Sequence, residues 1–185
     1  MIVDSDGPGG KPFTCFESGA ILQYLAETTG RLLPQDTAAK YEAIQWLMVQ
    51  MTTVGPMFGQ CIHFRVFAPE AGNDYARSRY TTQAIRVFEA IERRLTASPW
   101  LNGTEYGIAD IATWPWARNI PRFLSAEVVA KLPATLKWIA GIGERPAVVA
   151  ALARVEDLRA RTTALDKAAP QDIDRLFGRG QFAAA

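Results

Sequence analysis

The spacing of apolar and polar positions separates a short extended segment at the start of the chain from a long helical remainder. Residues 2–3 and 13–16 are short, mostly apolar strand candidates, and residues 6–12 between them hold three glycines and two prolines. Such clusters mark turns between strands. The two runs therefore predict a β-hairpin.

From residue 18 onward the apolar positions recur with a helical period. The first helix runs from Ser18 toward Gly30, which stands where a left-handed C-terminal cap is expected. The Gly55-Pro56 pair predicts a kink or break in the next helix, because proline has no N–H and clashes with the preceding turn. Further helices are predicted at residues 74–95, 107–115, 133–142 and 147–158. The predicted fold class is mainly α.

The composition indicates a folded globular protein and argues against some partners. Hydrophobic residues make up 49% of the 185 residues, enough to fill a sizeable core. Twenty Lys and Arg against nineteen Asp and Glu give a net charge of +1, without a basic block that could follow a nucleic-acid backbone. No apolar run approaches the ~20 residues that span a bilayer. We expect a cytoplasmic protein with neither a nucleic-acid nor a membrane partner.

Few side chains of this sequence are suited to bind a metal ion. Cys15 and Cys61 are too far apart for a redox pair or a zinc site, and we expect both to be buried, reduced thiols. His63 is the one histidine, and a single imidazole near a single thiol does not make a ligand set. No metal cofactor is expected.

An acid and a hydroxyl, Glu17 and Ser18, stand where the extended segment gives way to the first helix. Free backbone N–H groups and the positive end of the helix dipole meet at such a position. A carboxylate can therefore bind beside the Ser18 hydroxyl while Glu17 takes an ammonium group. The pair could hold an α-amino-acid head group. Ordinary helix capping is the alternative, since serine and acids are common at helix starts.

Several separate motifs resemble the glutathione S-transferase family, in the order in which that family carries them. Its glutathione-binding segment is similar to residues 16–27, FESGAILQYLAE, and its interdomain linker to residues 32–34, LLP. A segment of bacterial Nu-class members is similar to residues 55–60, GPMFGQ. The buried folding motif of the helical domain resembles residues 99–103, PWLNG, and 106–112, YGIADIA. The resemblance extends from about residue 2 to residue 152.

The resemblance implies an all-helical C-terminal domain of the glutathione-transferase type. A remnant of a thioredoxin-like α/β domain, a β-hairpin plus a helix, would precede it. The implied parts are a partial thioredoxin-like domain at residues 1–30, a linker at 31–37, the helical domain at 38–160 and a C-terminal tail at 161–185. Asp110 would serve folding, as the acid of the buried motif.

The resemblance also implies a site. Glu17 and Ser18 would hold the γ-glutamyl head of glutathione, which would be a substrate. The second substrate would be a small hydrophobic electrophile or a disulfide, and family members are usually homodimers. The substrate cleft would be lined by Phe58, Gln60, His63 and Phe64.

The catalytic residue cannot be assigned from the resemblance. A glutathione transferase begins with a βαβ unit that carries the thiolate-activating residue and is followed by a cis-proline, and such a unit needs ~30 or more residues. Sixteen residues precede Glu17 here, so both features fall outside this sequence and catalysis by the chain as given is not implied. Three functions stay open: a glutathione transferase or glutathione-dependent disulfide reductase, a non-catalytic glutathione-binding protein, and a helical dimerisation scaffold.

Overall fold

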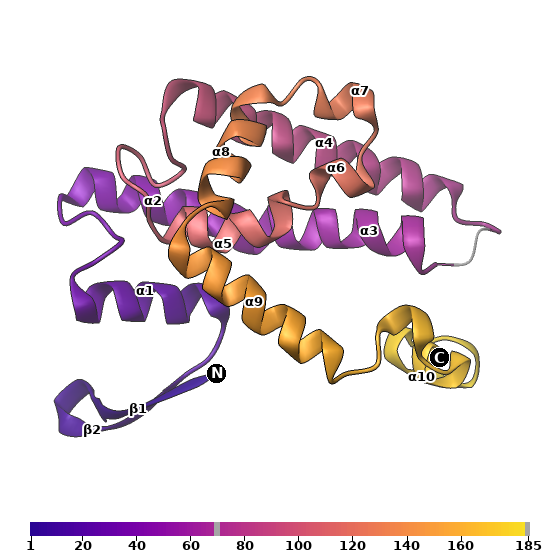
Figure 1. The fold of residues 1–185 in the computed structure, drawn as a ribbon, viewed down its shortest axis with the longest axis horizontal. Coiled ribbons are helices and arrows are strands. Elements are labelled where there is room, and N and C mark those ends of the chain that lie inside the picture. The colour runs from indigo at the N-terminus through magenta and orange to yellow at the C-terminus, as the bar shows by residue number, and fades with distance from the viewer. Residues whose placement is uncertain (69–70, 184–185) are drawn as a thin grey trace. The chain divides into compact units, whose positions relative to one another are not determined.

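The computed structural model describes residues 1–68 and 71–183, which fall into two compact units, Met1–Gly141 and Ile142–Ala185. In the first unit a hairpin precedes a set of helices (Figure 1). Its elements are β1 (Ile2–Gly7), η1 (Pro8–Gly10), β2 (Lys11–Cys15), α1 (Ser18–Thr29), α2 (Thr37–Val49), η2 (Gln50–Phe58), α3 (Gly59–Val66), α4 (Asp74–Ala97), α5 (Ile108–Ala117), α6 (Ile120–Phe123), α7 (Ala126–Val129) and α8 (Pro133–Gly143), whose last residues belong to the second unit. The second unit holds α9 (Pro146–Ala160), η3 (Leu165–Lys167), α10 (Pro170–Phe177) and η4 (Gly180–Phe182). The prediction of a mainly α fold with an initial hairpin is confirmed. The division into a thioredoxin-like part, a linker and a helical domain stays a prediction.

The hairpin is antiparallel and is held by the helix that follows it. Asp4 of β1 lies opposite Phe13 of β2, and Gly9 in the connecting turn takes the left-handed φ of 73° that glycine adopts without strain. The Tyr24 hydroxyl of α1 donates to the Asp4 carboxylate over 2.6 Å, and its ring packs 5.2 Å from that of Phe13. A two-stranded hairpin alone is marginally stable in water, so this hairpin depends on its contacts with α1.

Helix α1 shares a hydrophobic core with the helices of the first unit. The Ile108 N–H at the start of α5 donates to the Leu32 carbonyl just after α1, over 3.0 Å. The buried side chains of this cluster come from α1, the segment after it, α2 and α5; they are Ala26, Leu33, Ala43, Leu47 and Ile108. Helix α1 is therefore held in the first unit by packing against α2 and α5.

The amphipathic helix α4 supplies much of the remaining core of this unit. Its buried residues follow the helical period predicted from the sequence; they are Ala84, Val87, Phe88, Ile91 and Leu95. The ring of Phe88 meets that of Phe58 edge to face, with centroids 4.9 Å apart. Helix α4 thereby packs against η2 and α3.

The segment around Pro56 stays helical, so of the kink or break expected at Gly55-Pro56 the break does not occur. The π-helical segment η2 follows α2 directly and leads into α3. Its turns are wider than α turns, and the Gly59 N–H at its end donates to the carbonyls of both Gly55 and Pro56. The wider turns accommodate the missing N–H of proline without ending the helix.

The buried carboxylate of Asp110 joins the loop before α5 to helix α8. It accepts hydrogen bonds from the backbone N–H groups of Leu101 (2.9 Å), Asn102 (3.2 Å) and Gly107 (3.1 Å), and from the indole N–H of Trp138 (2.8 Å). Burial raises the pKa of Asp110, and the hydrogen bonds, led by that of the Leu101 N–H, act in the opposite direction. These contacts support the structural role expected for Asp110.

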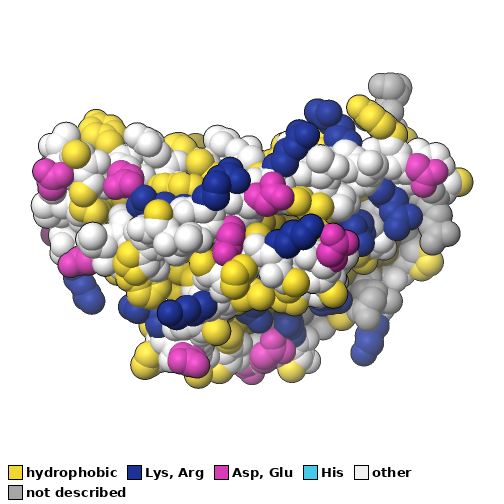
Figure 2. Space-filling view, turned by 90° about the horizontal axis from the view of Figure 1, so that it is seen from above, with side chains coloured by type: hydrophobic (Ala, Val, Ile, Leu, Met, Phe, Trp, Pro, Cys, Tyr) yellow, Lys and Arg dark blue, Asp and Glu magenta, His cyan; other side chains and the backbone are white. Residues whose placement is uncertain are grey.

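Charge is mixed on the face of the molecule that Figure 2 shows, where basic and acidic side chains are interspersed among apolar and uncharged ones. This agrees with the nearly balanced composition. None of the described helices combines the length and the apolar character that a bilayer crossing requires.

Candidate functional site

The residue before helix α1 has an unusual backbone. Glu17 is its N-cap and has φ 67° and ψ 124°, a conformation that costs a residue other than glycine of order 1–3 kcal/mol. The Glu17 carbonyl still accepts from the Ile21 N–H over 2.9 Å, so the helix begins immediately after the turn. The side chains of Glu17 and Ser18 are both exposed. Strain of this kind concentrates at functional sites.

The start of α1 is suited to bind an anion. The first N–H groups of a helix have no partner within it, and here no side-chain hydrogen bond caps this end among the residues described. The helix dipole and the exposed Ser18 hydroxyl add to the attraction for a carboxylate, while Glu17 can accept an ammonium group. Ordinary helix capping was the alternative explanation for Glu17 and Ser18. The hydrogen bonds of the described residues do not support it.

Helix α1 meets η2 at this same end. The Ser18 hydroxyl lies 3.9 Å from the sulfur of Met51, a weak contact. A Cβ added to Gly19 would fall 3.0 Å from that sulfur, so a larger residue at this position would require the Met51 side chain to shift. The candidate site therefore lies where the first helix touches the helical bundle.

The four residues expected to line a substrate cleft differ in their surroundings. Phe58 is fully buried and packs on Phe88, so no substrate can contact it in this structure. The expectation for Phe58 is corrected, because η2 turns this ring toward α4 and into the core. Gln60, on α3, is exposed.

His63 and Phe64 form an aromatic cluster between α3 and α4. The Phe64 ring stacks on Tyr80, with centroids 5.3 Å apart and an angle of 4° between the planes. His63 meets Phe64 edge to face at 5.1 Å. All three side chains are partly exposed, so they can contact a small molecule. Tyr80 was not among the residues expected to line the cleft, although its place on the apolar side of α4 could have indicated it.

The two cysteines are free and buried, as expected. Burial raises the pKa of the Cys61 thiol, whose sulfur lies 3.8 Å from the Thr81 hydroxyl. A thiol with a raised pKa is a poor nucleophile at neutral pH. Over residues 1–68 and 71–183, no three His, Cys, Asp or Glu side chains are grouped so that they could hold a metal ion.

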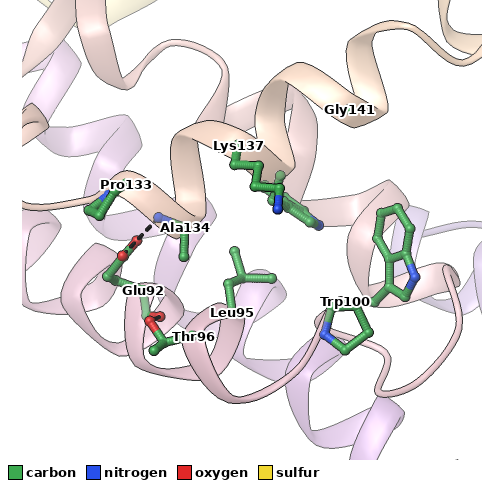
Figure 3. Close-up of a pocket in the computed structure, with 10 residues that line it drawn as sticks. Glu92, Leu95, Thr96, Trp100, Pro133, Ala134, Lys137 and Gly141 are labelled. Atoms are coloured by element: carbon green, nitrogen blue, oxygen red, sulfur yellow. Dashed lines mark hydrogen bonds between the residues drawn. The ribbon is translucent and has the colours of Figure 1, made fainter.

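The sequence reasoning also missed a hollow of 570 Å³ between α4 and α8 (Figure 3). At one end of it, the Glu92 carboxylate accepts from the backbone N–H groups of Ala134 (2.9 Å) and Thr135 (2.8 Å) and from the Thr135 hydroxyl (2.7 Å). These partners are more than forty residues apart in the chain. No local pattern could therefore have indicated the hollow.

Comparison with known proteins identifies the family. The family described as glutathione S-transferase, C-terminal domain, matches residues 74–141. The disulfide-bond oxidoreductase YfcG of Escherichia coli is 43% identical over 156 residues, which are 84% of this chain and 71% of YfcG. The chain belongs to the glutathione S-transferase family. This confirms the resemblance inferred from the motifs.

Solved structures of glutathione S-transferases have the same fold. A protein of Burkholderia graminis, solved with two glutathione molecules bound per subunit, is 48% identical with a TM-score of 0.73, over 80% of this chain and 63% of that one. A protein of Pseudomonas putida, solved with one glutathione disulfide bound per subunit, is 45% identical with a TM-score of 0.73, over 79% of this chain and 65% of that one. The chain thus spans slightly less than two thirds of these two proteins.

Proposed function

We propose that this glutathione S-transferase binds glutathione at the start of α1 and serves the reduction of disulfides by glutathione. Ser18 and the first N–H groups of α1 receive the γ-glutamyl carboxylate, and Glu17 receives the ammonium group. The observation that carries the proposal is the strained turn at Glu17 before a helix end that no described side chain caps. The first N–H groups of α1 and the Ser18 hydroxyl can then bind a ligand.

The names and ligands of related proteins support a disulfide as the second substrate. YfcG and a second Escherichia coli protein, YghU, which is 37% identical over 145 residues, are both disulfide-bond oxidoreductases. In thiol–disulfide exchange, a glutathione thiolate attacks one sulfur of the substrate, forms a mixed disulfide and releases a thiol. A second glutathione attacks the mixed disulfide, which gives glutathione disulfide and the second thiol. Two glutathione molecules thus supply both electrons.

The partly exposed His63, Phe64 and Tyr80 support a place for the second substrate beside α3 and α4. Aromatic surface accommodates small apolar groups, and the exposed Gln60 adds a hydrogen-bonding side chain on the same helix. Phe58 would contribute only by supporting these side chains from the core.

A homodimer in the cytoplasm is part of the same proposal. Val3, Phe16 and Leu25 are exposed apolar side chains on or beside the hairpin and α1, and covering them in a dimer would be favourable. Light scattering after size-exclusion chromatography tests this, with Phe16→Ser expected to shift the equilibrium toward the monomer. A monomeric wild-type protein at high concentration would contradict the dimer.

Calorimetric titration with glutathione tests the binding site. Glu17→Gln should weaken binding about tenfold or more, because a hydrogen bond to a charged group is typically worth about 1.5–3 kcal/mol. Ser18→Ala should weaken it by a smaller factor, since backbone N–H groups continue to bind the carboxylate. Glu89→Gln, on the exposed side of α4, is the matched control and should leave the affinity unchanged.

A glutathione analogue that lacks the α-amino group makes the test specific to the assigned roles. Glu17→Gln should bind this analogue as the wild type does, because the interaction with the ammonium group is already absent. Equal losses for both ligands would show that Glu17 acts on the fold and not on the ammonium group. No heat from glutathione with the wild-type chain would overturn the site.

The reaction class is tested by comparing two assays on the same protein. Reduction of a small dialkyl disulfide by glutathione, coupled to glutathione reductase and NADPH, should exceed conjugation of an aromatic halide. Turnover of the halide alone would overturn the disulfide assignment and leave the binding site standing.

A further inference from the structure

The hollow between α4 and α8 has the dimensions of a small-molecule site. Its volume of 570 Å³ lies within the range of about 300–1,000 Å³ typical of ligand pockets. It is bounded by the end of α4, the loop at Pro99 and Trp100, and the first turns of α8 (Figure 3). Neither Glu17 nor Ser18 lines it, so it is separate from the proposed glutathione site.

Most of the residues that line the hollow are apolar, and its two tryptophans are held in place. Leu95 lies between its two ends, and Trp100 stands at one side (Figure 3). The Trp100 ring packs edge to face against Tyr106 at 5.4 Å, and the Trp138 indole is fixed by its hydrogen bond to Asp110. Rigid aromatic side chains provide contact area with little loss of conformational entropy on binding.

The two charged groups of the hollow differ in what they already bind. Glu92 accepts three hydrogen bonds from the first turn of α8, so its charge is compensated by backbone N–H groups and the helix dipole. Lys137 is exposed and extends from α8 toward the space between Leu95 and Trp100 (Figure 3). Within the described part of the chain, no hydrogen bond or ion pair of its ammonium group is found. A positive charge beside an aromatic wall is therefore available to a ligand.

We propose that this hollow binds a small planar aromatic anion, such as an aromatic carboxylate. Its ring lies against Trp100 and Leu95, and its acid group is held by the Lys137 ammonium. The anion lies at the Lys137 side, because the Glu92 carboxylate already accepts three hydrogen bonds and offers no donor to a second acid group. Binding here is independent of glutathione.

Two probes of equal shape and different charge test the proposal on the full chain. The probes are 2-naphthoate and its neutral amide, 2-naphthamide. Binding is followed by nuclear magnetic resonance through the indole N–H signals of the five tryptophans, with the Trp100 signal assigned from Trp100→Phe. We expect 2-naphthoate to shift the Trp100 signal saturably, with or without glutathione.

Charge variants separate the role of Lys137 from a general effect. Lys137→Gln should lower the affinity for 2-naphthoate about two- to fivefold, as expected for loss of a single exposed ion pair. The affinity for 2-naphthamide should stay unchanged. Lys131→Gln, an exposed lysine paired with Glu127 outside the hollow, is the matched control and should change neither. Trp100→Leu should weaken both probes.

Three results would overturn the proposal. The first is the absence of any saturable shift of the Trp100 signal with 2-naphthoate. The second is an equal effect of Lys137→Gln on the charged and the neutral probe. The third is displacement of 2-naphthoate by glutathione, since the two sites share no residue.

Discussion

Removing the Asp110 carboxylate should destabilise the protein more than a typical substitution does. In Asp110→Ala, the N–H groups of Leu101, Asn102, Gly107 and Trp138 lose their acceptor at a fully buried place. Each buried, unpaired donor costs about 1–3 kcal/mol, and part of this is offset because a desolvated charge disappears. We expect the free energy of unfolding to fall by about 3–5 kcal/mol, near the upper end for single substitutions.

Thermal melts followed by circular dichroism measure this effect. At this chain length ~1 kcal/mol shifts the Tm by about 2–4 °C, so the expected decrease is roughly 6–20 °C. Asp110→Asn keeps the shape of the side chain but turns its NH₂ group toward two N–H donors. It should therefore lower the Tm by nearly as much as Asp110→Ala. Asp157→Ala, which removes an exposed acid paired with Arg161, is the control and should stay within about 2 °C. If Asp110→Ala melts within about a degree of the wild type, the reasoning is refuted.

Two further predictions concern the loop before α5 and the hairpin. Gly107→Ala should lower the free energy of unfolding by ~1–3 kcal/mol, because its Cβ would fall 2.1 Å from the Asn102 side-chain nitrogen, whereas the control Gly141→Ala meets nothing within 4 Å. Equal melts for Gly107→Ala and the wild type would contradict this prediction, because the same Cβ would also fall 2.5 Å from the Leu32 carbonyl oxygen. The Tyr24 hydroxyl holds the pKa of Asp4 below 3.8, so the contribution of Asp4 to stability is present above pH 3.8 and is lost as the pH falls through the lowered pKa. Tyr24→Phe should raise the Asp4 pKa toward 3.8 in a carboxyl-carbon titration, and an unchanged pKa would contradict this hydrogen bond.

Local patterns in the sequence predicted the elements that depend on neighbouring residues. The hairpin follows from two apolar runs around a turn rich in glycine and proline, and the buried face of α4 follows from its helical period. The position of Glu17 and Ser18 at the start of α1 was predicted for the same reason, because helix starts have local signals. The strained φ of Glu17 was not predicted, since nothing in its residue type requires it.

Features that depend on long-range packing could not be predicted from these patterns. Trp138 reaches Asp110 from 28 residues away, and Glu92 meets Thr135 from 43 residues away, so neither contact has a periodic signal. Phe58 lies in a segment that resembles one of Nu-class members and was expected to line the substrate cleft, yet an apolar ring is equally suited to a core. Proline at position 56 indicated a disturbance of the helix, but the disturbance could be a break or a wider turn.

Helices α2, η2 and α3 follow one another directly, and the wide turns of η2 allow this continuous helix to lose a residue without being interrupted. A π turn encloses one residue more than an α turn between its hydrogen-bonded partners, so loss of a residue there can be absorbed by tightening to α geometry. The same deletion inside α3 would rotate every later side chain by about 100° and turn Phe64 away from Tyr80. A deletion within Gln50–Phe58 can therefore alter the surroundings of Met51 and still leave Phe64 stacked on Tyr80.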